Sequence, residues 1–158
     1  KALLETVAEG GEHGKILMKK ENLARAAVKK MIELEPLNKD GERGCIINTA
    51  SVAAYEGQIG QIAYSASKGG VVGMTLPAAR ELSKFGVRVV TIAPGLMETP
   101  MLKGMPEHVF QSLIDTTLFP KRLGTGKDYA KTVAHIFDNP LLNGETIRLD
   151  GAIRLAPK

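Results

Sequence analysis

The run Val87-Arg88-Val89-Val90-Thr91-Ile92-Ala93-Pro94-Gly95 decides how this chain folds. Most of its residues are β-branched, and apolar side chains fall on both alternating faces. That pattern is typical of a strand that is covered on both sides, as in a parallel sheet. Pro94 and Gly95 end the pattern, because proline has no N–H for a strand ladder. We therefore predict a buried strand over 87–93.

The segments on either side alternate between strand and helix patterns. A short apolar strand is predicted over 45–48. A long helix should run from about Ile62 to Lys84, with Gly86 as its C-terminal cap. The remaining predicted elements are a short helix or loose segment over 1–14, helices over 15–34, 106–117 and 126–138, and a strand over 145–149. Strands separated by helices predict an α/β fold with a parallel sheet, which would be narrow and have an open edge.

Composition excludes several classes of protein. The chain has 158 residues, enough for one domain with a core, and 21 basic against 17 acidic residues give a net charge of +4. The densest basic run, over 15–30, is interpreted as a solvated helix face, so no nucleic-acid partner is expected. No apolar run approaches the ~20 residues of a membrane span. Cys45 is the only cysteine, which excludes an intrachain disulfide, and no Cys/His cluster predicts a metal site.

A serine, a tyrosine and a lysine form the pattern that could carry chemistry. Tyr64 and Lys68 are four residues apart, so a helix places them on one face. A nearby ammonium favours the phenolate form of a tyrosine and makes it usable as an acid and base near neutral pH. Ser51 lies just past the predicted strand over 45–48, where its hydroxyl could hold a substrate oxygen.

These residues are predicted to meet at one edge of the sheet. Ligands of a doubly wound sheet bind beyond the carboxyl ends of its strands. Ser51 follows one predicted strand and the segment 94–99 follows the next, while Tyr64 and Lys68 lie at the start of the helix between them. We therefore expect the three elements to converge on one crevice.

The same residues resemble the short-chain dehydrogenase/reductase family. Tyr64 follows Ser51 by thirteen residues and precedes Lys68 by four, and the runs over 90–95 and 147–151 also look like that family. The runs over 46–58, 142–145 and 148–152 are similar to its subgroup of type II 3-hydroxyacyl-CoA dehydrogenases. The resemblance implies a Rossmann-like doubly wound parallel sheet and covers about residues 34–158.

The resemblance also implies roles for individual residues. Ser51, Tyr64 and Lys68 would be catalytic: Tyr64 as general acid and base, Lys68 as the group that favours its phenolate and holds the nicotinamide ribose, and Ser51 as the partner of the substrate oxygen. The implied cofactor is NAD, with NADP as the alternative. The residues implied to bind the cofactor are Tyr64, Lys68, Pro94, Gly95, Met97 and Thr99; those implied to bind the substrate are Ser51, Gln58 and Gln61.

By the same resemblance, the reaction is hydride transfer between NAD and a secondary alcohol or ketone, with 3-hydroxyacyl-CoA going to 3-oxoacyl-CoA. The partner is a small acyl-CoA-like molecule, with no nucleic acid and no membrane. A homotetramer built through the helices over 15–34 and 62–84 is implied, in the cytoplasm or, in a eukaryote, the mitochondrial matrix. The alternatives are another short-chain reductase, acting on 3-oxoacyl-carrier-protein or a hydroxysteroid, and a non-catalytic fragment or assembly partner.

The chain departs from the family pattern in its N-terminal part. The family's Thr-Gly-x-x-x-Gly-x-Gly phosphate loop is absent, and Gly124 and Gly126 are only a partial imitation. The acidic residue that grips the cofactor ribose is also absent, and Ile16 occupies the position where the family usually has an asparagine. We therefore expect residues 1–158 to be one incomplete domain, with the phosphate-loop half missing or diverged.

Overall fold

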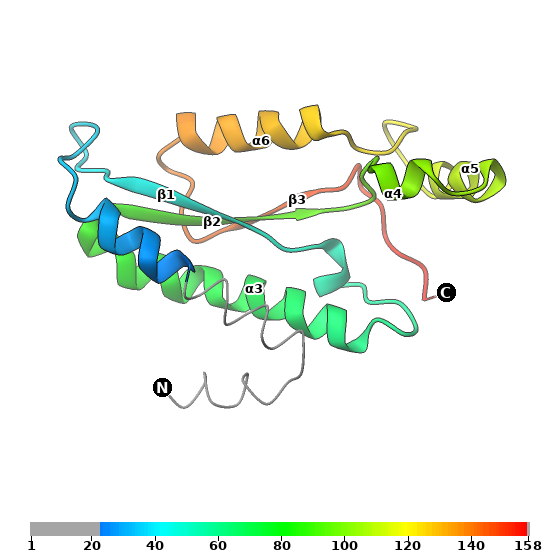
Figure 1. Ribbon diagram of the computed structural model, residues 1–158, viewed down its shortest axis with the longest axis horizontal. Coiled ribbons are helices and arrows are strands. Elements are labelled where there is room, and N and C mark those ends of the chain that lie inside the picture. The colour runs from blue at the N-terminus through cyan, green and yellow to red at the C-terminus, as the bar shows by residue number, and fades with distance from the viewer. Residues whose placement is uncertain (1–22, 158) are drawn as a thin grey trace.

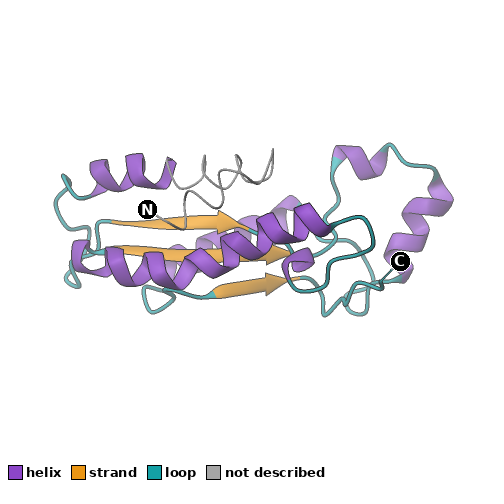
Figure 2. Cartoon of the chain, turned by 90° about the horizontal axis from the view of Figure 1, so that it is seen from below, coloured by secondary structure: helices purple, strands orange, loops and turns teal. Residues whose placement is uncertain are grey.

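Helices cover both faces of a parallel sheet in the computed structural model, which describes residues 23–157 (Figure 1). Helix α3 (Ile62–Leu82) lies on one face and helix α6 (Gly126–Asp138) lies on the other. Figure 2 shows the strands running in the same direction with α3 across them. Within residues 23–157 the sheet has three strands in the order β1 (Gly44–Thr49), β2 (Val87–Pro94) and β3 (Thr146–Leu149).

The predicted α/β fold with a parallel sheet is confirmed. Strand β2 pairs in parallel with β1 on one side and with β3 on the other. In the described part of the chain, β1 and β3 each have one strand neighbour, so the expected open edge is present. All residues of β1 and β3 keep some exposure to solvent, whereas β2 is buried over seven of its eight residues.

The element bounds differ from the prediction at a few places. A short 3₁₀ helix, η1 (Val52–Ala54), interrupts the predicted loop after β1. Helix α4 (Pro100–Lys103) was not predicted, because four residues are too few to show a helical period. Helix α5 (Glu107–Asp115) matches the prediction over 106–117. Of the helix predicted over 15–34, the structure shows 23–31 as helical and 32–34 as a turn, so the helix ends three residues earlier than predicted; 15–22 and the segment 1–14 lie outside the described residues.

Strand β2 forms the centre of the core because its two faces pack against different helices. Val90 and Ile92 pack against Ile136 of α6, and all three are fully buried. On the opposite face, the hydroxyl groups of Thr91 and Thr75 share a buried hydrogen bond of 2.6 Å between β2 and α3. Since both faces are covered, the β-branched run needs no polar face, which explains its sequence.

Gly86 joins α3 to β2 in a conformation that favours glycine. Its φ of 72° lies in the left-handed region, and its N–H donates to the carbonyl of Ser83 at 3.0 Å. A Cβ at this position would collide with the carbonyl of Gly41. The predicted C-terminal cap is therefore confirmed, and it fixes where β2 begins.

Arg88 is the charged exception in β2 and fastens the amino end of the sheet. Only 6% of the residue is exposed. Its Nε donates to Oε1 of Glu42 at 2.9 Å, and its Nη1 donates to the carbonyls of Ile136 and Leu142, each at 2.9 Å. The last turn of a helix has carbonyls without intrahelical partners, and Arg88 satisfies one of them in α6.

None of the helices in the described part of the chain has both the length and the apolar character that a bilayer crossing requires.

We predict that Arg88→Leu lowers the free energy of unfolding by about 3–5 kcal/mol, because it leaves a half-buried carboxylate and two carbonyls without their donor. Urea denaturation of the full-length protein measures this change. The control is Lys30→Met, which removes the exposed ion pair with Glu33 and should cost no more than about 0.5 kcal/mol. A loss below about 1 kcal/mol for Arg88→Leu would contradict the prediction.

Candidate active site

Ser51 lies two residues beyond the end of β1, where it caps η1. Its backbone is extended, with a φ of −166°, and its Oγ accepts a hydrogen bond from the N–H of Ala53 at 3.1 Å. A serine at this position is the preferred way to satisfy the first N–H groups of a helical turn. The bond fixes the direction of the half-buried hydroxyl and leaves its proton available for donation.

Tyr64 and Lys68 lie in the first two turns of α3, as predicted. The Nζ of Lys68 is 5.6 Å from the centre of the Tyr64 ring, and it donates to the carbonyl of Thr49 at 3.4 Å. Thr49 is the last residue of β1, so this contact places the ammonium beside the carboxyl end of the strand. Partial burial disfavours the charged form and lowers the pKa of Lys68. Tyr64 is 39% exposed, so its side chain is reachable by a ligand.

Thr49 also connects this edge of the sheet to the helix on the other face. Its hydroxyl shares a hydrogen bond of 2.6 Å with the phenol of Tyr129 in α6. Thr49 therefore contacts a side chain from each covering helix. Its carbonyl accepts from Lys68 of α3, and its hydroxyl shares a hydrogen bond with Tyr129 of α6.

Of the other residues predicted to bind the cofactor, Pro94 is the last residue of β2, one residue beyond the predicted strand end, and Gly95, Met97 and Thr99 follow it. The N–H of Gly95 donates to the carbonyl of Leu149 at 3.0 Å, and a Cβ on Gly95 would lie only 2.8 Å from the Cβ of Asp150. Met97 pairs with the backbone of Gly124. Thr99 caps α4, and its Oγ1 accepts from the N–H of Leu102 at 3.4 Å. Their role toward a cofactor stays a prediction.

Gln58 and Gln61 contact each other, and Gln58 also contacts the C-terminal tail. The Nε2 of Gln58 donates to the carbonyl of Ala156 at 3.0 Å. The N–H of Gln58 donates to Oε1 of Gln61 at 3.2 Å. These amides therefore hold the loop between η1 and α3, and their predicted role in binding substrate stays a prediction.

Sequence reasoning missed an ionic cluster beside Ser51, which we call the tail clamp and define as Glu56, Arg148, Asp150 and Arg154. Arg148 donates to Glu56 through Nη1 and to Asp150 through Nε, each at 2.7 Å. Arg154 lies 3.3 Å from Glu56 and 3.4 Å from Asp150. The hydrogen bond from Arg148 is the main cause that lowers the pKa of Glu56. Arg148 and Asp150 are two residues apart, so a contact between their side chains could be expected along a strand. Glu56 lies 92 residues from Arg148, and no local pattern indicates that it joins them.

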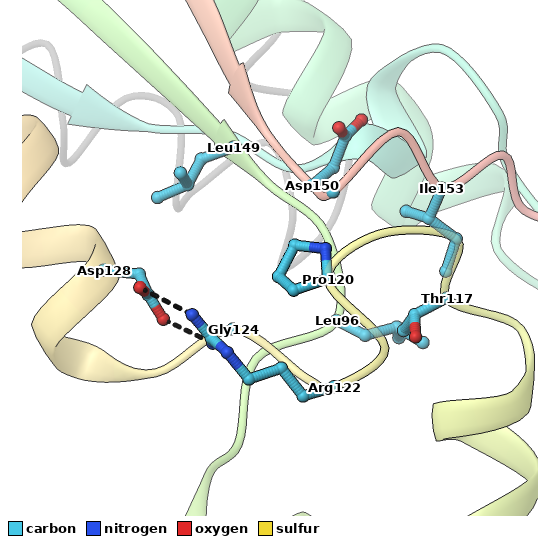
Figure 3. A pocket seen from close by; sticks show the side chains of 10 residues that line it. Leu96, Thr117, Pro120, Arg122, Gly124, Asp128, Leu149, Asp150 and Ile153 are labelled. Atoms are coloured by element: carbon cyan, nitrogen blue, oxygen red, sulfur yellow. Dashed lines mark hydrogen bonds and ion pairs between the residues drawn. The ribbon is translucent and has the colours of Figure 1, made fainter.

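A cavity of about 130 Å³ lies between the strand ends of β2 and β3 and the loop before α6 (Figure 3). Arg122 closes one side, with two hydrogen bonds of 2.7 and 3.0 Å to Asp128. The lining residues are Leu96, Thr117, Pro120, Arg122, Gly124, Asp128, Leu149, Asp150, Gly151 and Ile153. Ser51, Tyr64 and Lys68 are not among them, so this cavity is distinct from the crevice expected at those residues. Within residues 23–157, no three or more His, Cys, Asp or Glu side chains are grouped to hold a metal ion.

Comparison with known proteins identifies the family. The profile of the family described as short chain dehydrogenase matches residues 21–109, more than half of the chain. The chain belongs to the short-chain dehydrogenase family.

Within that family, proteins named 3-hydroxyacyl-CoA dehydrogenase type-2 are among the relatives to which the chain is similar. The 3-hydroxyacyl-CoA dehydrogenase type-2 of Homo sapiens is 58% identical over 136 residues, which make up 86% of this chain and 52% of the relative. The protein of the same name from Drosophila melanogaster is also 58% identical over 136 residues, 86% of this chain and 53% of the relative. The crystal structure of 3-hydroxyacyl-CoA dehydrogenase type-2 from Mycobacterium avium has a TM-score of 0.84 at 48% identity, and the match covers 87% of this chain and 53% of that chain. The chain thus spans about half the length of these relatives.

We predict that the tail clamp stabilises the protein at neutral pH and stops doing so in acid. The pKa of Glu56 in the folded protein lies below its ordinary value of 4.5, so its contribution is present above that value and is lost as the pH falls below it. The free energies of unfolding of the wild type and Glu56→Gln should differ at about pH 7 and converge toward about pH 3. Asp150, Arg148 and Arg154 are the same in both proteins, so the difference reports on the carboxylate of Glu56. A difference that is independent of pH would contradict the prediction.

Proposed function

We propose that the protein to which this chain belongs is an NAD-dependent oxidoreductase that converts 3-hydroxyacyl-CoA to 3-oxoacyl-CoA. The observation that carries the proposal is the position of Lys68, whose ammonium lies beside the Tyr64 ring and against the end of β1, close in sequence to Ser51. The similarity to relatives named 3-hydroxyacyl-CoA dehydrogenase type-2 supports the choice of substrate.

The residues at the strand ends fit a nicotinamide cofactor. An ammonium has three N–H donors, and among the described residues the structure gives Lys68 one hydrogen bond, to a backbone carbonyl. Lys68 can therefore also donate to ribose hydroxyls. Thr99 accepts a hydrogen bond at Oγ1, which leaves its own proton for a ligand. NAD is the proposed cofactor and NADP the alternative. When bound, the cofactor supplies the hydride acceptor.

Ser51, Tyr64 and Lys68, which we call the trio, each have a distinct part in oxidation of the alcohol. Ser51 donates a hydrogen bond to the substrate oxygen and holds it against Tyr64. Tyr64 accepts the hydroxyl proton at its phenolate oxygen as the hydride leaves the neighbouring carbon, so the substrate loses one proton and one hydride. Lys68 places a positive charge 5.6 Å from the centre of the Tyr64 ring, beside the group that exchanges the proton. In the reverse direction Tyr64 returns the proton to the ketone oxygen.

The outer face of α3 supports the proposal that the protein assembles as a homotetramer. Ile62 and Leu76 are 86% and 45% exposed, and Pro77 on the same helix is exposed as well. Exposed apolar side chains on one helix are typical of a surface that another chain covers. The cytoplasm, or the mitochondrial matrix in a eukaryote, stays the predicted compartment.

We predict that Tyr64→Phe reduces kcat of the full-length protein by at least about 10²–10⁴-fold, because it removes the group that transfers the proton. Steady-state rates of NAD reduction with a 3-hydroxyacyl-CoA measure this loss, and circular dichroism checks that the variant folds. Tyr55→Phe is the matched control, because it also removes one phenol hydroxyl and keeps its ring over Arg148. Retained turnover in Tyr64→Phe would contradict the assignment.

We also predict that kcat/KM is highest for acyl-CoA substrates. The comparison uses a 3-hydroxyacyl-CoA, the same acyl group on an acyl-carrier protein, and a hydroxysteroid, each with NAD and with NADP. A preference for the carrier protein or for the steroid would favour the alternative reductases and would overturn the proposed substrate. Absence of turnover with all three would favour the non-catalytic alternative.

A further inference from the structure

The tail clamp joins two segments that are far apart in the sequence, the loop between Ser51 and Tyr64 and the segment 148–157. The loop 55–59 contacts the tail 148–157 through side chains and backbone together. Besides its ion pair with Arg148, Glu56 accepts at Oε2 from the N–H of Leu155 at 3.0 Å. The N–H of Ile59 donates to the carbonyl of Pro157 at 3.0 Å. The tail is thus held along the whole length of the loop that follows Ser51.

The other side of the same tail packs on the end of β2. A Cβ on Gly95 would lie 2.8 Å from the Cβ of Asp150 and 3.1 Å from the Cγ2 of Ile153. Asp150 is also the second carboxylate bound by Arg148. The segment 148–157 therefore contacts both the loop 55–59, which follows the turn that Ser51 caps, and Gly95, the residue after the end of β2.

Glu56 is coupled to Ser51 by consecutive backbone hydrogen bonds. Its N–H donates to the carbonyl of Val52 at 3.0 Å, and the N–H of Ala54 donates to the carbonyl of Ser51 at 3.0 Å. A movement of Glu56 therefore moves η1, which Ser51 caps. Both oxygens of the carboxylate are used, Oε1 by Arg148 and Oε2 by the N–H of Leu155. A glutamine has one acceptor oxygen and cannot reproduce both bonds.

We propose that Glu56 is a positioning residue, which through Arg148 and the C-terminal tail fixes Ser51 relative to the end of β2. The proposal rests on the proposed function, in which Ser51 holds the substrate oxygen. A small displacement of a group that orients substrate lowers the rate of the chemical step more than it weakens binding.

A kinetic cycle on the full-length protein tests this role. Glu56→Gln should lower kcat with the 3-hydroxyacyl-CoA about tenfold and change each KM by less than about twofold. In a Ser51→Ala background the same substitution should change kcat by less than about twofold, because the group that it positions is gone. A general loss of structure would lower kcat by the same factor in both backgrounds. An unchanged kcat in Glu56→Gln, or an equal loss in the two backgrounds, would overturn the proposal.

Control measurements separate this proposal from the proposed function. Glu33→Gln removes a carboxylate from an exposed ion pair at the other end of the sheet and should leave kcat unchanged. Amide hydrogen exchange over 52–59 should be faster in Glu56→Gln than in the wild type and in Glu33→Gln. A wild type without turnover would overturn the proposed function alone. Faster exchange in Glu56→Gln would then still support the clamp, and unchanged exchange would overturn it.

Discussion

The parallel pairing of β2 on both of its edges is the constraint on which the other elements depend. Because β1 and β3 run alongside it in the same direction, all three strands end at one edge of the sheet. The connections must then cross the faces, which places α3 on one side and α6 on the other. The burial of β2 against both helices supplies the core, and the residues between strand ends and helix starts are left at one edge for chemistry.

That edge brings together groups that the chain order keeps apart. The carbonyl of Thr49 receives the ammonium of Lys68, and this contact connects the end of β1 to the second turn of α3. Gly95, which follows β2, donates to the carbonyl of Leu149 at the end of β3. It also packs against Asp150 and Ile153 in the tail that follows. Each strand end is therefore held by an element from elsewhere in the sequence, so the arrangement at this edge is a property of the whole sheet.

Local patterns predicted the three strands and the longer helices, and they placed Tyr64 and Lys68 on one helix. The β-branched run over 87–93 and the glycine at position 86 each indicate a structure that neighbouring residues determine. The same holds for Tyr64 and Lys68, whose spacing of four places them on one helix face. The ion pair of Arg88 with Glu42 and the tail clamp were not predictable, because their partners are separated by 46 and 92 residues and charged residues have no period that marks such contacts. The cavity behind Arg122 depends in the same way on packing between distant segments.

The sheet is fastened at each end by one arginine. Arg88 ties the amino end to the last turn of α6 and to the loop before β1, whereas Arg148 ties the carboxyl end to the loop after Ser51. The two fastenings share no residue, and the length of β2 separates them. Both arginines therefore hold together segments that are distant in the sequence, one at each end of the sheet. Because the two arginines share no partner, substitutions at one end of the sheet should add to those at the other in their effect on the free energy of unfolding.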